Sequence, residues 1–317
     1  MTATDGRDVE RSSLALGERL GSGGQGDVFP VGGGAVLLKE YKNPSEVDGA
    51  ELAGLVDFRQ SLAPADRARL DELAAWPLCR VVHGGRPVGF VMNAAPRRMT
   101  WINAAGNQRL LEMQFLLRTM KPGWRQIVQP TPEQRRDLAL ACAEAVAWFH
   151  AAGLVVGDIS HANALWSLSP NPTVYFLDCD GFRLTGSGAV LPQAATPDWS
   201  DPLAPSTEAT VDTDAYKTAL MVARILTQNA YALPDQALSF VKGCLDDRRE
   251  GAVRSLLAQA KGARGTRPRP GEWRIALSER GTIKLNAVTR RPRPVVDRSM
   301  FDVVRDRTPI PLQKPAR

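Results

Sequence analysis

The chain has 317 residues and 44% hydrophobic content, enough to bury a sizeable core in two lobes that share a cleft. Its four cysteines lie far apart and it has only three histidines, which supports neither a disulfide framework nor a zinc site and predicts reduced thiols in a cytoplasmic protein. The net charge of +6 is uneven, because residues 251–317 are net +11 and residues 1–250 are net −5.

The two ends of the chain differ from the rest in composition. Residues 1–13 are polar and charged, which predicts a flexible N-terminus that is not a signal peptide. The most apolar stretch, residues 138–157, contains Glu144 and His150 and therefore predicts a helix and a strand rather than a membrane span. Residues 287–317 are rich in Pro and Arg without periodicity, which predicts a basic tail. Such a tail is either a solvated extension or a docking segment for an acidic partner. The tail also leaves nucleic acid open as a partner, although no other feature of the sequence favours it.

Residues 14–95 are predicted to form a small antiparallel sheet with one or two helices. Over residues 14–42, short apolar runs alternate with glycine turns, which is typical of three strands. Residues 46–75 have a helical composition that is broken near Pro64. Residues 78–92 have the pattern of another hairpin, with two adjacent glycines at its turn.

Residues 96–286 are predicted to be mainly helical. Thr131 is typical of a helix N-cap, because a proline follows it and a glutamine stands at the third helical position. The helix that follows presents one apolar face. The residues of this face are Leu138, Cys142, Ala145 and Phe149. Short strands are expected within residues 154–177, and further helices over residues 213–228 and 236–260.

Three glycines in the first hairpin fit the pattern G-x-G-x-x-G, which is a weak signal by itself. They are Gly21, Gly23 and Gly26. A Rossmann fingerprint needs a helix directly afterwards, whereas Val28 lies in a strand-like run; a Walker loop needs Gly-Lys-Ser/Thr, which is absent. Two interpretations remain, a glycine-rich hairpin with a structural role or a loop whose backbone approaches nucleotide phosphates.

Lys39 ends an apolar strand thirteen residues after Gly26. A single lysine is usually exposed, but a lysine on a buried strand behind a phosphate loop can contact nucleotide phosphates. It needs an acidic partner, for which the following helical segment offers Glu51 as the first choice and Glu46 as the alternative.

Asp158 and Asn163 lie five residues apart in a loop between a helix and a short strand, and Asp178 ends another strand fifteen residues later. Phosphoryl transfer requires these residue types. One carboxylate orients a hydroxyl and accepts its proton, while an amide and a second carboxylate hold magnesium against a triphosphate. Either residue of the first loop alone would be unremarkable in a polar turn. The two loops in this order, after a glycine loop and a lysine, favour the catalytic interpretation.

Together these motifs resemble the protein kinase superfamily over residues 14–277 and are most similar to small bacterial Ser/Thr protein kinases with a divergent magnesium loop. The resemblance implies an α+β, bilobal protein-kinase-like fold, with a small antiparallel-sheet N-lobe (residues 14–95) and a mainly helical C-lobe (residues 96–286). It also implies transfer of the γ-phosphate of ATP, bound with Mg²⁺ or Mn²⁺, to a hydroxyl of a protein substrate. Similar bacterial kinases often act beside a PP2C-type phosphatase, which is a further expected partner.

The resemblance also implies a role for each motif. Asp158 would be the catalytic base. Lys39, held by Glu51, would bind phosphate, and Asn163 and Asp178 would be the metal ligands. The remaining nucleotide contacts would come from the glycine loop and from the hinge that binds adenine. These residues are Gly21, Gly23, Gly26, Val28, Met92 and Ala95.

Three later segments extend the resemblance. Thr196–Trp199 resembles the part of a kinase activation segment that faces the substrate. Asp214 resembles the aspartate that opens the long central helix and bonds the backbone of the catalytic loop. Arg267 resembles the arginine near the end of the C-lobe that pairs with a glutamate of the activation segment.

The chain also departs from the family pattern. Gly157 replaces the arginine that binds a phosphorylated activation loop, and Ser160 replaces a lysine that touches the γ-phosphate. Residues 178–180 read Asp-Cys-Asp instead of Asp-Phe-Gly. Residues 201–203 read Asp-Pro-Leu instead of Ala-Pro-Glu, so Arg267 is expected to lack its usual partner.

Two other functions remain open. Small-molecule kinases of the aminoglycoside or choline type share the Gly-Asp-x-x-x-x-Asn loop and often carry two later acids, as Asp178 and Asp180 are here. A pseudokinase scaffold would act through binding alone, but scaffolds often lose one of the four site residues that this chain retains. The glycine loop and Thr196–Trp199 favour a protein substrate over a small alcohol.

Overall fold

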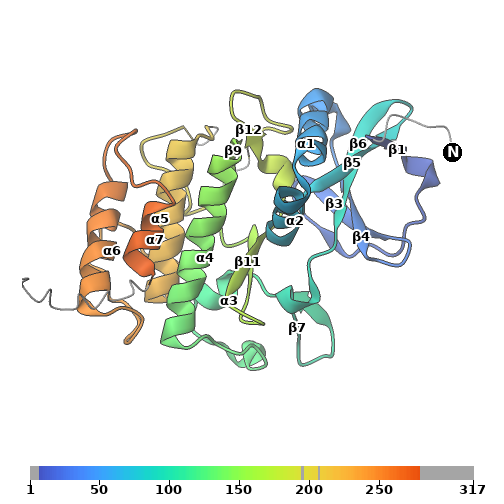
Figure 1. Ribbon diagram of the computed structural model, residues 1–317. Helices are drawn as coiled ribbons and strands as arrows, with labels where there is room; N and C mark the ends of the chain where they lie inside the picture. Colours follow the sequence, from blue (N-terminus) through green and yellow to red (C-terminus); the bar gives the residue numbers. More distant parts are fainter. Residues whose placement is uncertain (1–6, 194–195, 206–207, 279–317) are drawn as a thin grey trace, which may run out of the picture. The chain divides into compact units, whose positions relative to one another are not determined.

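The computed structural model describes residues 7–193, 196–205 and 208–278, and it is a mixed α+β structure (Figure 1). Its strands are β1 (Asp8–Glu10), β2 (Gly21–Ser22), β3 (Gly26–Val31), β4 (Val36–Tyr41), β5 (Pro77–His83), β6 (Arg86–Asn93), β7 (Thr100–Ile102), β8 (Gln108–Leu110), β9 (Leu154–Val155), β10 (Ala164–Ser167), β11 (Thr173–Phe176) and β12 (Arg183–Leu184). Its helices are α1 (Gly49–Ser61), α2 (Pro64–Leu73), α3 (Gln114–Leu117), α4 (Pro132–Ala151), α5 (Val211–Thr227), α6 (Asp247–Ala260) and α7 (Glu272–Leu277). The predicted basic tail, residues 287–317, lies outside the described residues.

The N-terminal half contains a six-stranded sheet in the order β1-β5-β6-β4-β3-β2, antiparallel except where β1 pairs with β5. The hairpin predicted over residues 78–92 is confirmed as β5 and β6. Gly84 and Gly85 form its turn with φ of 58° and 78°. Both values are in the left-handed region that a tight two-residue turn requires, which explains the glycine pair.

The prediction of a flexible N-terminus over residues 1–13 is wrong where the structure describes that segment, because Asp8–Glu10 pairs in parallel with β5. Arg80 on β5 anchors it with two hydrogen bonds to the Asp8 carboxylate, at 2.7 and 2.8 Å. The same guanidinium donates to the carbonyl of Gly49 at the start of α1. A polar segment is therefore ordered by a bidentate charge pair that its composition did not reveal.

The helical segment predicted over residues 46–75 is confirmed as two helices that separate at Pro64. Asp48 caps α1 by accepting hydrogen bonds from the backbone N–H groups of Ala50 and Glu51. The buried faces of both helices join the main hydrophobic core, where Trp76 donates its indole N–H to the carbonyl of Leu55.

The C-terminal half is built around α4 and α5, which lie side by side, with α6 and α7 packed against them (Figure 1). The predicted capping box at the start of α4 is confirmed, and all four residues of its predicted apolar face are buried. Every residue from Thr213 to Leu226 of α5 is buried. A helix buried on all sides brings its polar residues into the interior, where each needs a partner.

The helix predicted over residues 236–260 is wrong in its first half, because α6 begins only at Asp247. Gly243 has φ of 86°, a conformation that no right-handed helix passes through. Asp246 then caps the new helix by accepting the backbone N–H of Arg249 at 2.7 Å. Across the described ranges, no helix combines the length and apolar character needed to cross a membrane.

Candidate functional site

Three of the predicted site residues meet around one small cavity. Asp158 follows β9, Asn163 precedes β10 and Asp178 follows β11. The antiparallel pairing of β10 with β11 brings the last two together, and Leu177 donates its N–H to the carbonyl of Asn163 at 2.9 Å. All three line a cavity of about 60 Å³. Polar side chains separated by twenty residues are thus placed in one site by a short hairpin.

Asn163 fixes the carboxylate of Asp158. Its amide nitrogen donates to Oδ2 of Asp158 at 2.7 Å and to the Asp158 carbonyl at 3.1 Å. Because the nitrogen is used in this way, the amide oxygen is the acceptor that Asn163 can offer to a cation. Asp178 is 54% exposed and has a left-handed backbone with φ of 52°. This conformation is sparsely populated for residues other than glycine, although Asp and Asn tolerate it.

Lys39 is buried and reaches the same site from β4. Its Nζ lies 2.7 and 3.0 Å from the two carboxylate oxygens of Asp180 and 3.3 Å from Oδ1 of Asp178. Burial disfavours the ammonium, but the two carboxylates outweigh this effect and raise the pKa of Lys39 above its ordinary value. Lys39 is therefore a charged group at the cavity, as its position on a strand behind the glycine loop predicted.

The predicted pair between Lys39 and Glu51 is not formed. Glu51 instead accepts the backbone N–H of Gly188 at 2.9 Å. A second contact holds the same end of α1, because Asp48 donates its N–H to the carbonyl of Val190 at 2.8 Å. Asp180 is only 1% exposed and takes the place that Glu51 was expected to fill. The alternative, Glu46, lies before α1 and belongs to neither contact.

The glycine loop is the turn between β2 and β3. Gly23 donates its N–H to the carbonyl of Gly26, and the Gly23 carbonyl accepts from Nζ of Lys42 at 2.6 Å. A Cβ on Gly26 would lie 2.6 Å from the carbonyl oxygen of Glu40, so strand packing alone requires glycine there. Gly21 and Gly23 meet no such obstacle, and Gln25 lines the cavity.

The other predicted nucleotide contacts lie further along the sheet. Val28 on β3 is half-buried and sits opposite Lys39 in the strand pairing. Met92 near the end of β6 is buried in the main core, and Ala95 is half-buried just beyond that strand. Between them, the N–H of Ala94 donates a hydrogen bond to the carbonyl of Ala35.

Asp158 is in an environment that raises its pKa above the ordinary value. Burial is the main cause, and the negative charge of Asp178 adds to it. The positive charge of Lys217, on α5, has the opposite effect, as do the hydrogen bonds that Asp158 accepts. One of these comes from Thr196, whose hydroxyl lies 3.1 Å from both carboxylate oxygens. Thr196 is thus brought to Asp158 from thirty-eight residues away.

The backbone before Asp158 is fixed by α5. Asp214, fully buried, accepts the N–H of Val156 at 2.7 Å and that of Gly157 at 2.9 Å, which confirms the predicted contact. Lys217, one turn further along α5, donates to the carbonyl of Gly157 at 2.7 Å. Gly157 itself has φ of 79°. Lys217 was not predicted, although its spacing of three residues from Asp214 places both on one face of the helix.

The segment that follows is anchored at two points. Trp199 donates its indole N–H to Nδ1 of His161 at 2.8 Å and stacks on that ring. Burial lowers the pKa of His161, which favours the neutral ring that can accept this bond. The guanidinium of Arg224 also contacts Trp199, 4.2 Å from the ring centroid.

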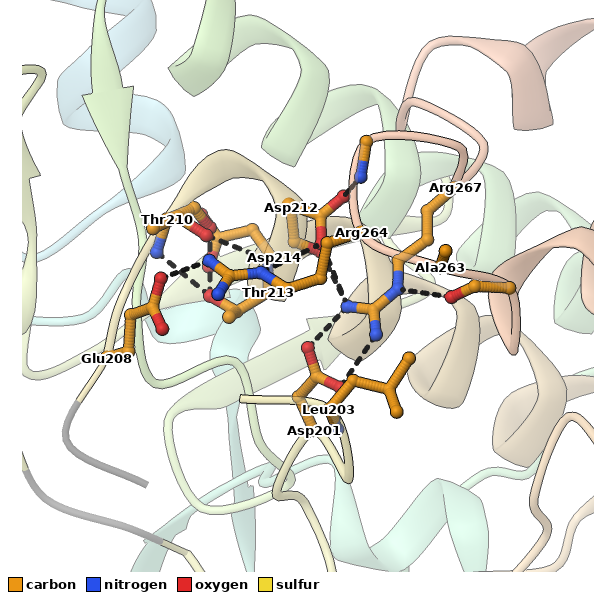
Figure 2. Close-up of polar contacts among 12 residues, drawn as sticks. Asp201, Leu203, Glu208, Thr210, Asp212, Thr213, Asp214, Ala263, Arg264 and Arg267 are labelled. Atoms are coloured by element: carbon orange, nitrogen blue, oxygen red, sulfur yellow. Dashed lines mark hydrogen bonds and ion pairs between the residues drawn. The ribbon is translucent and has the colours of Figure 1, made fainter. Parts of the chain in front are cut away.

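The second anchor corrects the expectation that Arg267 lacks a partner (Figure 2). Its guanidinium forms a bidentate pair with Asp201, one bond measuring 2.8 Å, and both side chains are at most 2% exposed. Asp212 adds a second carboxylate, 3.1 Å from Arg267. The acid stands before the proline of this segment instead of after it, which is why the family pattern did not reveal it.

The oxygen atoms at the cavity suit a hard cation. Asp178 and Asn163 offer a carboxylate and an amide oxygen, the donors that Mg²⁺ prefers, and the exposure of Asp178 leaves room for water ligands. Within the part of the chain that the structure describes, no three His, Cys, Asp or Glu side chains gather as a metal-binding cluster. Compared with known proteins, the chain matches no family and none of the curated sequences.

Proposed function

We propose that the chain is an ATP-dependent phosphotransferase with a bilobal, protein-kinase-like fold, acting on hydroxyl groups of a protein. One observation carries the proposal. Asp158, Asn163 and Asp178 line one cavity, and Lys39 contacts Asp178 beside it, so that three segments supply the chemical types that phosphoryl transfer requires. A buried cation, a carboxylate held by an amide, and a more exposed carboxylate have distinct roles there.

In this proposal Asp158 orients the attacking hydroxyl and accepts its proton as the new oxygen–phosphorus bond forms and the bond to the leaving ADP breaks. Lys39 neutralises phosphate charge, and Asn163 and Asp178 hold the metal. Bound Mg²⁺ would supply charge stabilisation to the phosphate oxygens. The bond from Thr196 to Asp158 supports a protein substrate, because it joins the segment that would face the substrate to the base.

The proposal requires one movement. A cavity of about 60 Å³ is well below the roughly 300–1,000 Å³ typical of ligand sites, so a nucleotide needs more room. Gln25 and residues 191–193 line the cavity, and the same later segment holds Glu51 and Asp48. Displacement of residues 188–193 would both open the cavity and free Glu51 to approach Lys39.

A second candidate is transfer to a small alcohol, and the position of Asp180 favours it. Both acids of the Asp-Cys-Asp sequence approach Lys39, an arrangement with two acids that resembles the small-molecule kinases. The two candidates differ in substrate and share the base, so one experiment separates them.

The experiment measures phosphate transfer from labelled ATP with Mg²⁺ to the chain itself, to generic protein substrates and to small alcohols. Asp158→Asn keeps the shape of the side chain and removes its capacity to accept a proton. We expect transfer to fall by about 10²–10⁴-fold with little change in nucleotide affinity. Asp66→Asn, on the exposed surface of α2, is the matched control. Full activity in Asp158→Asn would contradict the role of Asp158 as the base, and absence of transfer by the wild type to every acceptor would contradict the proposal and favour a binding scaffold.

A further inference from the structure

A larger hollow lies away from the candidate site. It has a volume of about 750 Å³, within the range of ligand sites, and is bounded by the β7–β8 hairpin, the loop before α4 and the end of β10. We name it the β7–β10 groove. Its apolar residues include Trp101, Ile102, Ile127, Val128, Trp166 and Leu168. None of its lining residues is charged, and none of them lines the cavity at Asp158.

The edge of the β7–β10 groove carries exposed aliphatic side chains. Ile102 is 54% exposed and Val128 is 75% exposed, although both line the hollow. Trp166, at its base, is fully buried. Exposed apolar residues that border a concave apolar surface are typical of a surface that binds another molecule.

The segment that bears this groove is strongly basic. Residues 96–130 contain six Lys or Arg and one Glu, within residues 1–250 that are net −5. Five of these basic residues are exposed, and none forms an ion pair with any part of the chain that the structure describes. They are Arg97, Arg98, Arg109, Lys121 and Arg125.

Two of the basic residues adjoin residues that line the groove. Arg109 pairs directly with Trp101 across β7 and β8, so both side chains leave the same face of the hairpin. Arg125 adjoins Gln126, which lines the hollow. The groove therefore combines an uncharged apolar floor with a positive rim.

We propose that the β7–β10 groove binds an extended peptide segment of a partner protein, in which apolar side chains are flanked by acidic ones. The apolar side chains fill the hollow and the acidic ones face the arginines. Single-stranded nucleic acid fits less well, because it requires exposed aromatic faces on which bases stack. The exposed groups here are aliphatic, Trp166 is buried, and the half-buried Trp101 packs edge-on against Phe115. This inference goes beyond phosphate transfer and does not depend on it.

The test is fluorescence anisotropy of the full chain at low salt. The probe is a fluorescein-labelled peptide with leucines at alternate positions between runs of aspartate. Ile102→Asp, which places a charge at the apolar edge of the groove, is expected to weaken binding about tenfold or more. The double variant Arg109→Glu and Arg125→Glu is expected to weaken binding about tenfold and to reduce its salt dependence.

Matched controls place the same changes elsewhere. Ile275→Asp alters an aliphatic residue of α7 that is 57% exposed, and Arg248→Glu reverses an exposed charge at the start of α6. Both are expected to bind the probe as the wild type does. Circular dichroism of each variant checks that the fold is retained.

Four outcomes would overturn the proposal. Absence of saturable binding to the probe, or equal binding by Ile102→Asp, would show that the groove does not hold the peptide. Equal binding of a peptide with serines in place of leucines would show non-specific charge attraction. Tighter binding of a labelled oligothymidine that displaces the peptide would identify the surface as a nucleic-acid site.

Discussion

The two sides of the candidate site are held in different ways. On one side, the backbone at Asp158 is fixed from α5 by the fully buried Asp214 and the buried Lys217. On the other side, Glu51 and Asp48 of the α1 region are held by backbone groups of residues 188–190, and the bond to Glu51 is exposed. Buried charged contacts are costly to break, whereas exposed ones are exchanged for water at little cost.

This difference indicates which part of the site can move. The Asp158 loop is expected to keep its geometry, because its partners lie in a helix that is buried from Thr213 to Leu226. The α1 side is expected to change partners more readily, because its bond from Gly188 to Glu51 is exposed to water. We call the Asp158 loop with α5 the rigid side and the α1 region with residues 188–190 the exchangeable side. Substitutions on the rigid side are expected to have the larger effects.

The largest effect is expected on the rigid side, at Arg267. Arg267→Met leaves the buried Asp201 without its partner and should lower the free energy of unfolding by about 3–5 kcal/mol. The double variant with Asp201→Leu removes both charges and should recover most of the loss. Urea denaturation followed by tryptophan fluorescence measures both. Arg69→Met, whose pair with Glu72 is exposed, is the control and should change stability by less than about 0.5 kcal/mol. A similar fall in the free energy of unfolding in Arg69→Met and Arg267→Met would contradict the difference between buried and exposed charge pairs.

The two acids near Lys39 are expected to differ. Asp180→Asn removes the buried counter-charge and leaves only Asp178 near the ammonium, so the free energy of unfolding should fall by about 2–3 kcal/mol. Asp178→Asn alters a carboxylate that is 54% exposed and should cost less than about 1 kcal/mol. Chemical denaturation measures this difference.

The same two variants separate structure from metal binding. Thermal stability should rise with ATP and Mg²⁺ in the wild type and in Asp180→Asn, by mass action, and much less in Asp178→Asn. An equal rise in wild type and Asp178→Asn would remove Asp178 from the metal role.

Much of the secondary structure could be predicted from local signals. The glycine pair at Gly84, the cap at Thr131 and the proline at Pro64 each act within a few residues, and each is confirmed. One failure needed long-range information, because the strand at Asp8 depends on Arg80, 72 residues away. The late start of α6 depends instead on a local conformation, the left-handed backbone of Gly243.

The candidate site also has a part that the sequence predicted and a part that it did not. The sequence predicted that Asp158, Asn163 and Asp178 belong together, because a loop and a short hairpin fix their order and spacing. It did not predict that Asp180 holds Lys39 or that Asp201 holds Arg267. A carboxylate can approach a buried cation from several positions, and only packing decides which one does so.

The pH dependence of activity is expected to depend on Lys217. Asp158 can accept a proton only when ionised, so transfer should fall as the pH drops through its raised pKa. Lys217 stabilises the ionised form, and Lys217→Met should therefore move the acid limb of the kcat/KM profile to higher pH. Lys217→Arg retains the charge and should leave the limb closer to that of the wild type. An unchanged limb in Lys217→Met would show that the lysine only supports the backbone at Gly157.

The smallest effect is expected on the exchangeable side. Gly188→Pro removes the N–H that holds Glu51, a bond worth about 1 kcal/mol, and so favours the state in which Glu51 is free to pair with Lys39. Nucleotide affinity, measured by calorimetry with ATP and Mg²⁺, should then rise by up to about fivefold. Glu51→Ala removes the same bond to Gly188 and also removes the charge that Lys39 would need, so its affinity should not rise. If both variants gained affinity equally, release of the 188–190 segment alone would open the cavity. If neither changed, the contact between Glu51 and Gly188 would belong to the rigid part of the fold.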